Sequence, residues 1–161
     1  MNLSKNLKNG FLILMACLVL TACATQKTST TSGQMQGDTY TGTDTVKELA
    51  KGVPDRVFFA TNETVLTTAS RETLRKQAGW LRKNSDINVV LEGHADERGT
   101  REYNLALGER RANSAKDYLM TYGISSDRIS VLSYGKERPV DAGSSVLAWS
   151  KNRRSVTVKA N

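Results

Sequence analysis

The apolar positions along the chain follow a helical spacing in some segments and a strand-like pattern in others, and these patterns predict the order of the elements. A short and mostly apolar segment, RVFFA over 56–60, predicts a first strand. Leu74 and Leu81, with an alanine between them on the same face, predict a helix over 68–84. The segment INVVLEG over 87–93 then predicts a second strand that is largely buried.

A second helix, which begins between residues 100 and 104, has the clearest pattern in the chain. Its apolar face carries Leu105, Ala112, Ala115, Leu119 and Tyr122. Gly108 fills the remaining place in that stripe, which indicates close packing, and Gly123 is a typical residue at a helix end. The alternating segments 128–134 and 155–159 predict two further strands.

The order of the predicted elements is therefore strand, helix, strand, helix, strand, strand. A strand–helix–strand connection is right-handed and joins parallel strands, so we expect parallel strands in the first part of the sheet. This order predicts an α/β two-layer sandwich, with the helices packed on one face of a mixed sheet.

The N-terminal region has a different pattern from the rest of the chain. Residues 1–22 contain no acidic residue; two lysines near the start precede the apolar run GFLILMACLVL over 10–20. This run is too short for a transmembrane helix, which needs about 20 apolar residues, and is typical of a secretory signal peptide. It ends in Leu20-Thr-Ala-Cys23, which resembles the bacterial lipobox and predicts a lipid on Cys23. The alternative is an ordinary signal peptide in which Cys23 has no role.

After the signal peptide, the composition divides the chain into a tether and one domain. Thr, Ser, Gln and Gly dominate from residue 24 to 45, and so polar a stretch cannot bury enough surface to offset its ordering entropy. We therefore expect a lipidated cysteine and flexible tether over 23–45. The remaining residues, 46–161, are enough for an independent hydrophobic core.

The composition also excludes several classes of function. Two cysteines and one histidine are too few for a disulfide scaffold or for the common zinc sites. Ser144 and Ser145 lie in no GxSxG turn, so a serine hydrolase is not indicated. The net charge of +7 falls to +5 without residues 1–22, which suits an exported protein that meets an anionic polymer rather than nucleic acid. We expect no metal, no cofactor and no enzymatic activity.

The densest group of polar residues, EGHADERG over 92–99, follows the second predicted strand. Ligands of α/β sheets gather where a strand ends and the next helix begins. Arg111 lies one residue before core-facing Ala112, so it can lean back over the loop that carries Asp96. One anion beside one cation suits a small zwitterion. A plain ion pair that only holds the loop remains an equal alternative. His94, in the same segment, is more typical of an oriented structural group than of a metal ligand or a base.

Longer motifs in this region resemble a known family. The segments EGHADERGT (92–100), EYN (102–104), LGERRAN (107–113), ISVLSYGKERP (129–139) and SKNRR (150–154) are similar to the OmpA-like peptidoglycan-binding domain. The lipobox and the tether are similar to the lipoprotein branch of that family that serves the Tol–Pal system. The resemblance spans about residues 55–159 and implies the same sandwich fold.

The resemblance also implies a ligand and the residues that bind it. In this family the ligand is the diaminopimelate of the peptidoglycan stem peptide, and the binding pair falls on Asp96 and Arg111. The family often has Phe-Asp at the end of the first strand, whereas Phe59 is followed here by Ala60. We therefore expect Asn62 or backbone groups to line the site in place of a carboxylate, with His94 also among the ligand-binding candidates.

The implied role is that of a non-enzymatic lipoprotein anchored in the outer membrane through Cys23, with its domain facing the periplasm. The implied partners are peptidoglycan, TolB and possibly TolA, in maintaining envelope integrity and in constricting the outer membrane during division. One alternative is an OmpA-like wall-anchoring lipoprotein outside the Tol–Pal system. A less favoured one is a peptidoglycan hydrolase, for which the sequence offers no evident catalytic set.

Overall fold

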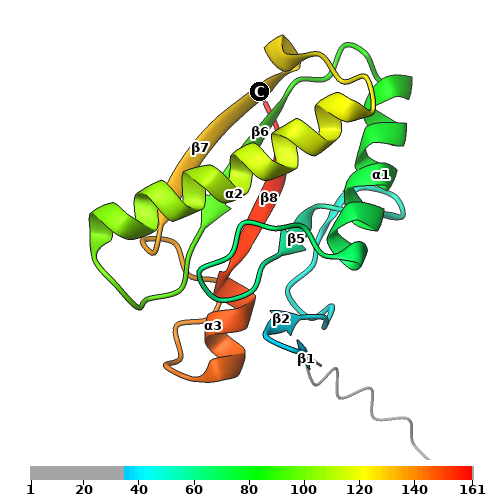
Figure 1. Ribbon diagram of the computed structural model, residues 1–161. Coiled ribbons are helices and arrows are strands. Elements are labelled where there is room, and N and C mark those ends of the chain that lie inside the picture. The colour runs from blue at the N-terminus through cyan, green and yellow to red at the C-terminus, as the bar shows by residue number, and fades with distance from the viewer. Residues whose placement is uncertain (1–34, 161) are drawn as a thin grey trace, which may run out of the picture.

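The computed structural model describes residues 35–160 (Figure 1). The elements in chain order are β1 (Met35–Gln36), β2 (Thr39–Tyr40), β3 (Glu48–Ala50), β4 (Val53–Pro54), β5 (Arg56–Phe58), α1 (Thr68–Lys83), β6 (Val89–His94), α2 (Arg101–Thr121), the 3-10 helix η1 (Ser126–Arg128), β7 (Ile129–Gly135), α3 (Val146–Asn152) and β8 (Arg154–Lys159). The predicted signal peptide and Cys23 lie outside the described residues. None of the helices formed by residues 35–160 is both long and apolar enough to span a membrane.

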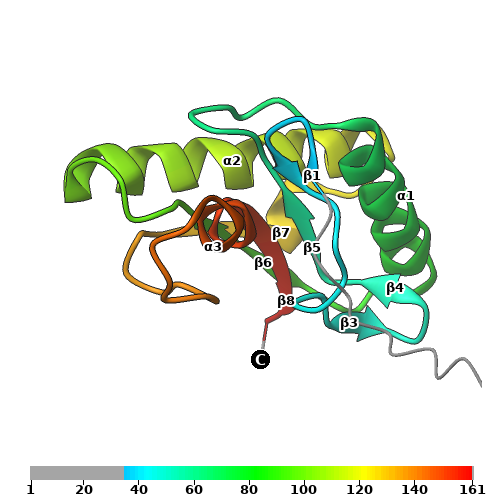
Figure 2. The same ribbon diagram turned by 90° about the horizontal axis from the view of Figure 1, so that it is seen from below.

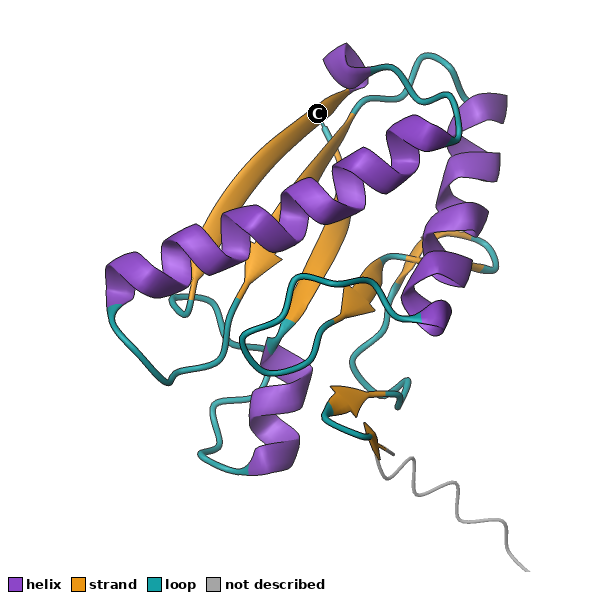
Figure 3. Cartoon of the chain, viewed as in Figure 1, coloured by secondary structure: helices purple, strands orange, loops and turns teal. Residues whose placement is uncertain are grey.

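The main sheet has the strand order β5-β8-β6-β7. β6 and β7 are parallel, and β8 runs antiparallel to both β5 and β6. Helices α1 and α2 cover one face of this sheet (Figure 3). The predicted two-layer α/β sandwich with a mixed sheet is confirmed. The pattern had not indicated α3, nor that the last strand, β8, is inserted between β5 and β6.

The hydrophobic core lies between the two helices and the sheet. It is formed by Val57, Phe59, Leu74, Ala78, Leu81, Val89, Leu91, Ala112, Ala115, Leu119, Ile124 and Ile129. Leu74 and Leu81, which predicted α1, and Leu119, which helped to predict α2, are within this core. Tyr122 only packs against the core, and Leu105 is half-buried and lies outside it. Helical spacing therefore placed the buried faces of both helices correctly except at Leu105.

The close packing expected at Gly108 is present and positions α2. A Cβ atom added to Gly93 would lie 1.8 Å from the carbonyl oxygen of Gly108, and one added to Gly108 would lie 2.4 Å from Ser133 Oγ. α2 therefore rests directly on the backbone of β6. Arg111, one turn later, is brought over the end of β6. Gly123, with φ +82°, lies just after the helix end, as predicted.

The prediction that the tether extends to residue 45 is wrong for its last part. Residues 38–45, which we call the strap, lie on the domain, and β2 packs beside α3 (Figures 1 and 2). Tyr40 is only 2% exposed and packs edge-on against Phe58, with 4.7 Å between the ring centroids. A buried aromatic side chain therefore helps to hold on the domain a segment whose composition is otherwise polar.

Candidate functional site

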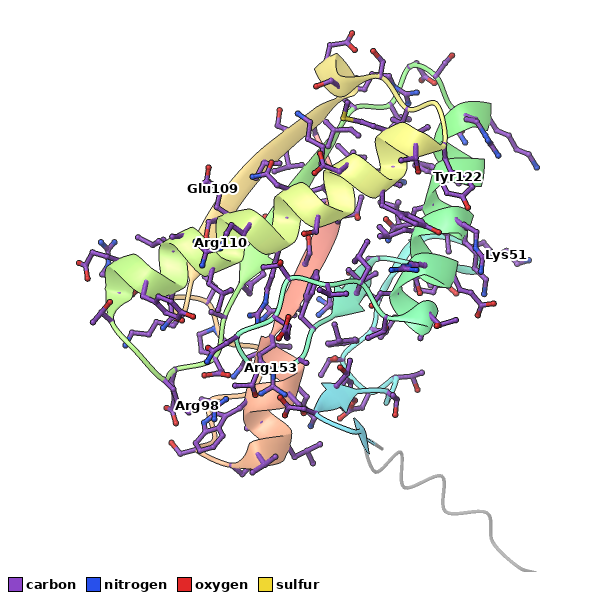
Figure 4. All side chains as sticks on the ribbon, viewed as in Figure 1. Lys51, Arg98, Glu109, Arg110, Tyr122 and Arg153 are labelled. Atoms are coloured by element: carbon purple, nitrogen blue, oxygen red, sulfur yellow. The ribbon has the colours of Figure 1, made fainter. Side chains whose placement is uncertain are left out.

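The candidate site lies at the carboxyl end of β6. Three segments meet there: the β6–α2 loop with Asp96, the loop that follows β5 (60–63), and the junction of α3 with β8. Arg98 and Arg153 both lie at this end of the molecule, near α3 (Figure 4). The structure therefore brings together residues that are far apart in the sequence.

Arg111 is fully buried and is held by backbone carbonyl groups. Its Nε donates to Glu63 O at 2.9 Å, Nη1 to His94 O at 2.9 Å and Nη2 to Ala60 O at 3.0 Å. Burial, and secondarily the charge of Arg153, lowers its pKa to about 10, so the guanidinium remains charged at neutral pH. Within residues 35–160, no carboxylate forms an ion pair with it. A buried cation with carbonyl partners alone is suited to an anionic ligand.

Asp96 is 6% exposed and is bound by two arginines. Arg98 donates from Nε to Oδ1 at 3.0 Å and from Nη2 to Oδ2 at 2.8 Å. Arg153 Nη1 lies 3.4 Å from Oδ2. Burial tends to raise the pKa of Asp96, but the hydrogen bonds from Arg98 and the charges of Arg98 and Arg153 hold it below its ordinary value. Asp96 is therefore an anion at neutral pH.

The alternative of a simple Asp96–Arg111 ion pair is wrong, because each residue has other partners. Both are also covered by other groups of the chain. Arg111 lies beneath the loop whose carbonyls it binds, and Asp96 lies beneath Arg98. The side chain of Arg98 is 41% exposed and stacks on Trp149, with 4.3 Å between its Cζ and the ring centroid. The cover of Asp96 is thus a partly exposed side chain at the surface.

Arg153 is a central residue of the site that the sequence analysis missed. It is 1% exposed, donates from Nε to Phe59 O at 3.1 Å, and pairs with both Asp96 and Asp38. The segment 150–154 had entered only as part of the family resemblance. A charged residue just before a strand is commonly a solvated turn residue, and only the fold shows that this one is buried.

Asn62 lies at the rim of the site. It is exposed, has φ +57°, and its Oδ1 accepts a hydrogen bond from Tyr103 Oη at 3.3 Å. The same loop supplies the two carbonyl groups, of Ala60 and Glu63, that bind Arg111. The structure thus places Asn62 with Asp96 and Arg111, on the loop where the sequence analysis expected it.

The expectation that the His94 side chain lines the site is wrong. Successive side chains of a strand point to opposite faces, and Gly93 faces α2, so the imidazole lies on the other face of the sheet. It stacks on Tyr134 with 5.6 Å between ring centroids, and neither ring nitrogen has a hydrogen-bond partner among the described residues. Burial, then the charges of nearby arginines, lowers its pKa to about 3. Only its carbonyl oxygen reaches the site, as a partner of Arg111.

Comparisons with known proteins agree with this architecture. Residues 58–153 match the OmpA family. The chain is 42% identical over 146 residues to a protein of Mesorhizobium japonicum named peptidoglycan-associated lipoprotein, covering 89% of this chain and 87% of that one. It is 41% identical over 160 residues to a protein of the same name from Agrobacterium fabrum, covering 97% and 90%.

Two solved structures are also similar. The crystal structure of the peptidoglycan-associated lipoprotein from Burkholderia pseudomallei has a TM-score of 0.64 and 32% identity, covering 66% of this chain and 90% of that one. The cell wall anchor of the T6SS from Pseudomonas aeruginosa has a TM-score of 0.54 and 28% identity, covering 66% and 80%.

Proposed function

The chain belongs to the OmpA family, and from this premise we propose that it is a lipoprotein of the cell envelope that binds peptidoglycan through its periplasmic domain. Relatives that cover most of the chain are named peptidoglycan-associated lipoproteins, and a cell wall anchor shares the fold. The observation that carries the proposal is the buried cation Arg111, which forms no ion pair within the described residues, beside the buried anion Asp96.

The proposed ligand group is the diaminopimelate of the stem peptide. Its carboxylate meets Arg111 and its ammonium meets Asp96, so each charge finds one of opposite sign. Charge-assisted hydrogen bonds are roughly twice as strong as neutral ones, which makes the pair a selective recognition element. Binding requires that Arg98 leave Asp96 and that the loop 60–63 shift off Arg111. Both covers lie at the molecular surface, since Arg98 is partly exposed and Asn62 is exposed.

The anchor and the remaining partners complete the proposal. Cys23 carries the lipid that holds the protein in the outer membrane, and TolB, with TolA, links it to the Tol–Pal machinery that maintains the envelope and constricts the outer membrane at division. The names of the relatives are consistent with this assignment.

A non-enzymatic role is supported by the state of the chain's single histidine. A hydrolase that used histidine as its base would need this side chain at the site, but His94 is buried on the opposite face of the sheet, with a pKa of about 3. In the described part of the chain, no three His, Cys, Asp or Glu side chains gather as a possible metal site. We therefore propose binding without turnover.

The test is a pull-down of the purified protein on isolated sacculi, with free diaminopimelate as competitor and with chemical analysis of the released wall fragments. We expect saturable binding that diaminopimelate reduces, and no release of fragments. Absence of binding to diaminopimelate-containing sacculi would refute the proposed function, and release of fragments would favour the hydrolase alternative.

A further inference from the structure

One carboxylate of the strap contacts both sides of the site. Asp38 Oδ2 accepts a hydrogen bond from the backbone N–H of Thr61 at 2.6 Å, and Oδ1 accepts one from Arg153 Nη2 at 3.0 Å. Arg153 also donates to the carbonyl oxygen of Asp38. Burial tends to raise the pKa of Asp38, but the bonds from Thr61 and the charge of Arg153 hold it below its ordinary value. Asp38 is thus ionised at neutral pH, when both contacts are strongest.

Each residue that Asp38 contacts is in turn linked to Arg111 or to Asp96. Thr61 directly follows Ala60, whose carbonyl binds Arg111, and it belongs to the loop that covers that guanidinium. Arg153 bonds the Phe59 carbonyl and pairs with Asp96. When Asp38 binds Thr61 and Arg153 together, it ties the covering loop to a buried side chain that is itself fixed.

We propose that Asp38 is a positioning residue that latches the loop 60–63 in its closed position over Arg111, so that the strap leading from the tether controls access to the site. The inference rests on the proposed function, because it concerns the same site. Release of the latch favours the open loop. A ligand that binds only the open state then associates faster, in proportion to the population of that state.

The latch is separable from the attachment of the strap. Tyr40 packs on Phe58, and Asp44 pairs with Lys151 Nζ at 2.9 Å, so the strap keeps two other anchors when Asp38 is changed. Asp44 lies on the same strap and makes an ion pair of the same kind, but with a residue of α3 rather than with the loop. Asp44→Asn is therefore a matched control for Asp38→Asn and Asp38→Ala.

The first measurement is the association rate of a stem tripeptide that ends in diaminopimelate, for the full-length chain and its variants. A charge-assisted hydrogen bond at a partly exposed residue has a modest net effect, so we expect Asp38→Ala to raise the rate constant about fivefold. Asp38→Asn keeps an acceptor for Thr61 but loses the charge facing Arg153. Its rate constant should therefore lie between those of the wild-type protein and of Asp38→Ala. Asp44→Asn should keep the wild-type rate, and all variants should stay folded.

The second measurement is amide hydrogen exchange in the protein without peptide. The Glu63 N–H bonds to Ala60 O within the covering loop and does not touch Asp38, so its exchange rate reports opening of the loop. It should rise in Asp38→Ala and stay unchanged in Asp44→Asn.

Unchanged or slower association in Asp38→Ala, with unchanged Glu63 exchange, would overturn the latch and leave the proposed function intact. Equal effects of the Asp38 and Asp44 variants would also overturn it, because they would show general loosening of the strap. If the wild-type protein fails to bind the peptide, the proposed function fails, whereas the Glu63 exchange rate still tests the latch by itself.

Discussion

Replacement of Arg111 by lysine and, separately, by methionine separates the two roles that the structure gives this side chain. Arg111 clamps three carbonyl groups from two segments and supplies a buried positive charge. Neither replacement can span the three carbonyls, because lysine donates from one nitrogen and methionine has no donor. Lysine keeps the charge, whereas methionine has a similar length without it. Both variants therefore lose the hydrogen bonds to the three carbonyl groups, and only Arg111→Lys keeps the positive charge.

The clamp sets the expected loss of stability. A hydrogen bond made by a charged group contributes about 1.5–3 kcal/mol, and an unpaired buried carbonyl costs a similar amount. Two or three such bonds are lost, but relief of the buried charge and entry of water offset part of the cost. We expect about 3 kcal/mol of destabilisation in both variants, which corresponds to a melting temperature lower by roughly 10 °C or more.

Binding should separate the two variants where melting does not. If Arg111 binds the ligand carboxylate, we expect Arg111→Met to weaken binding of the diaminopimelate tripeptide about a hundredfold and Arg111→Lys about tenfold or less. The assay is calorimetric titration well below the melting temperature of each variant, with circular dichroism to verify folding. Folded variants that bind equally well would refute the recognition role and leave Arg111 as a clamp alone.

Four further predictions follow from particular contacts. The pKa of His94 is about 3 in the folded protein, whereas its ordinary value is near 6.5, so the unfolded chain binds the proton first as the pH falls. The free energy of unfolding should therefore decrease as the pH decreases from about 6.5 toward 3, by up to about 1.4 kcal/mol per pH unit. His94→Gln should flatten this dependence in melting experiments. Gly108→Ala places a Cβ atom 2.4 Å from Ser133 Oγ and should lower both the melting temperature and binding, whereas Gly79→Ala, with nothing within 4 Å, should leave both unchanged or raise stability slightly. Cys23→Ser should leave the protein soluble or unprocessed, whereas intact-mass analysis of the membrane-extracted wild-type protein should show the added acyl chains. Sacculus binding should survive EDTA, and a loss restored by added metal would contradict the expectation of a metal-free site.

The sequence predicted the parts of the fold that depend on local periodicity. α1, α2 and the core residues that define them were found because one face of each helix repeats every three to four positions. The central place of β8 was not predictable in this way, because the alternation of a strand carries no information about which strands it joins. α3 escaped because it is short, Val146–Asn152, and carries exposed apolar side chains such as Val146.

The candidate site was predicted in part for a similar reason. The strand and helix pattern placed Asp96 and Arg111 at one end of the sheet, whereas Asn62 was expected there only from the family resemblance. His94 was misplaced because successive side chains of a strand point to opposite faces of the sheet. Gly93 faces α2, so the side chain of His94 points to the other face. Arg153 and Asp38 depend on contacts across 115 residues of chain, which no local pattern encodes.

The most direct test of the account is the choice between two stem tripeptides that differ only in their third residue, diaminopimelate or lysine. Lysine keeps the ammonium for Asp96 but lacks the additional carboxylate that Arg111 is proposed to bind. Titration of the purified protein should show the diaminopimelate peptide binding at least about tenfold more tightly, with the preference lost in Arg111→Met. Equal affinities for the two peptides, or a preference that survives in Arg111→Met, would contradict the assignment of this site.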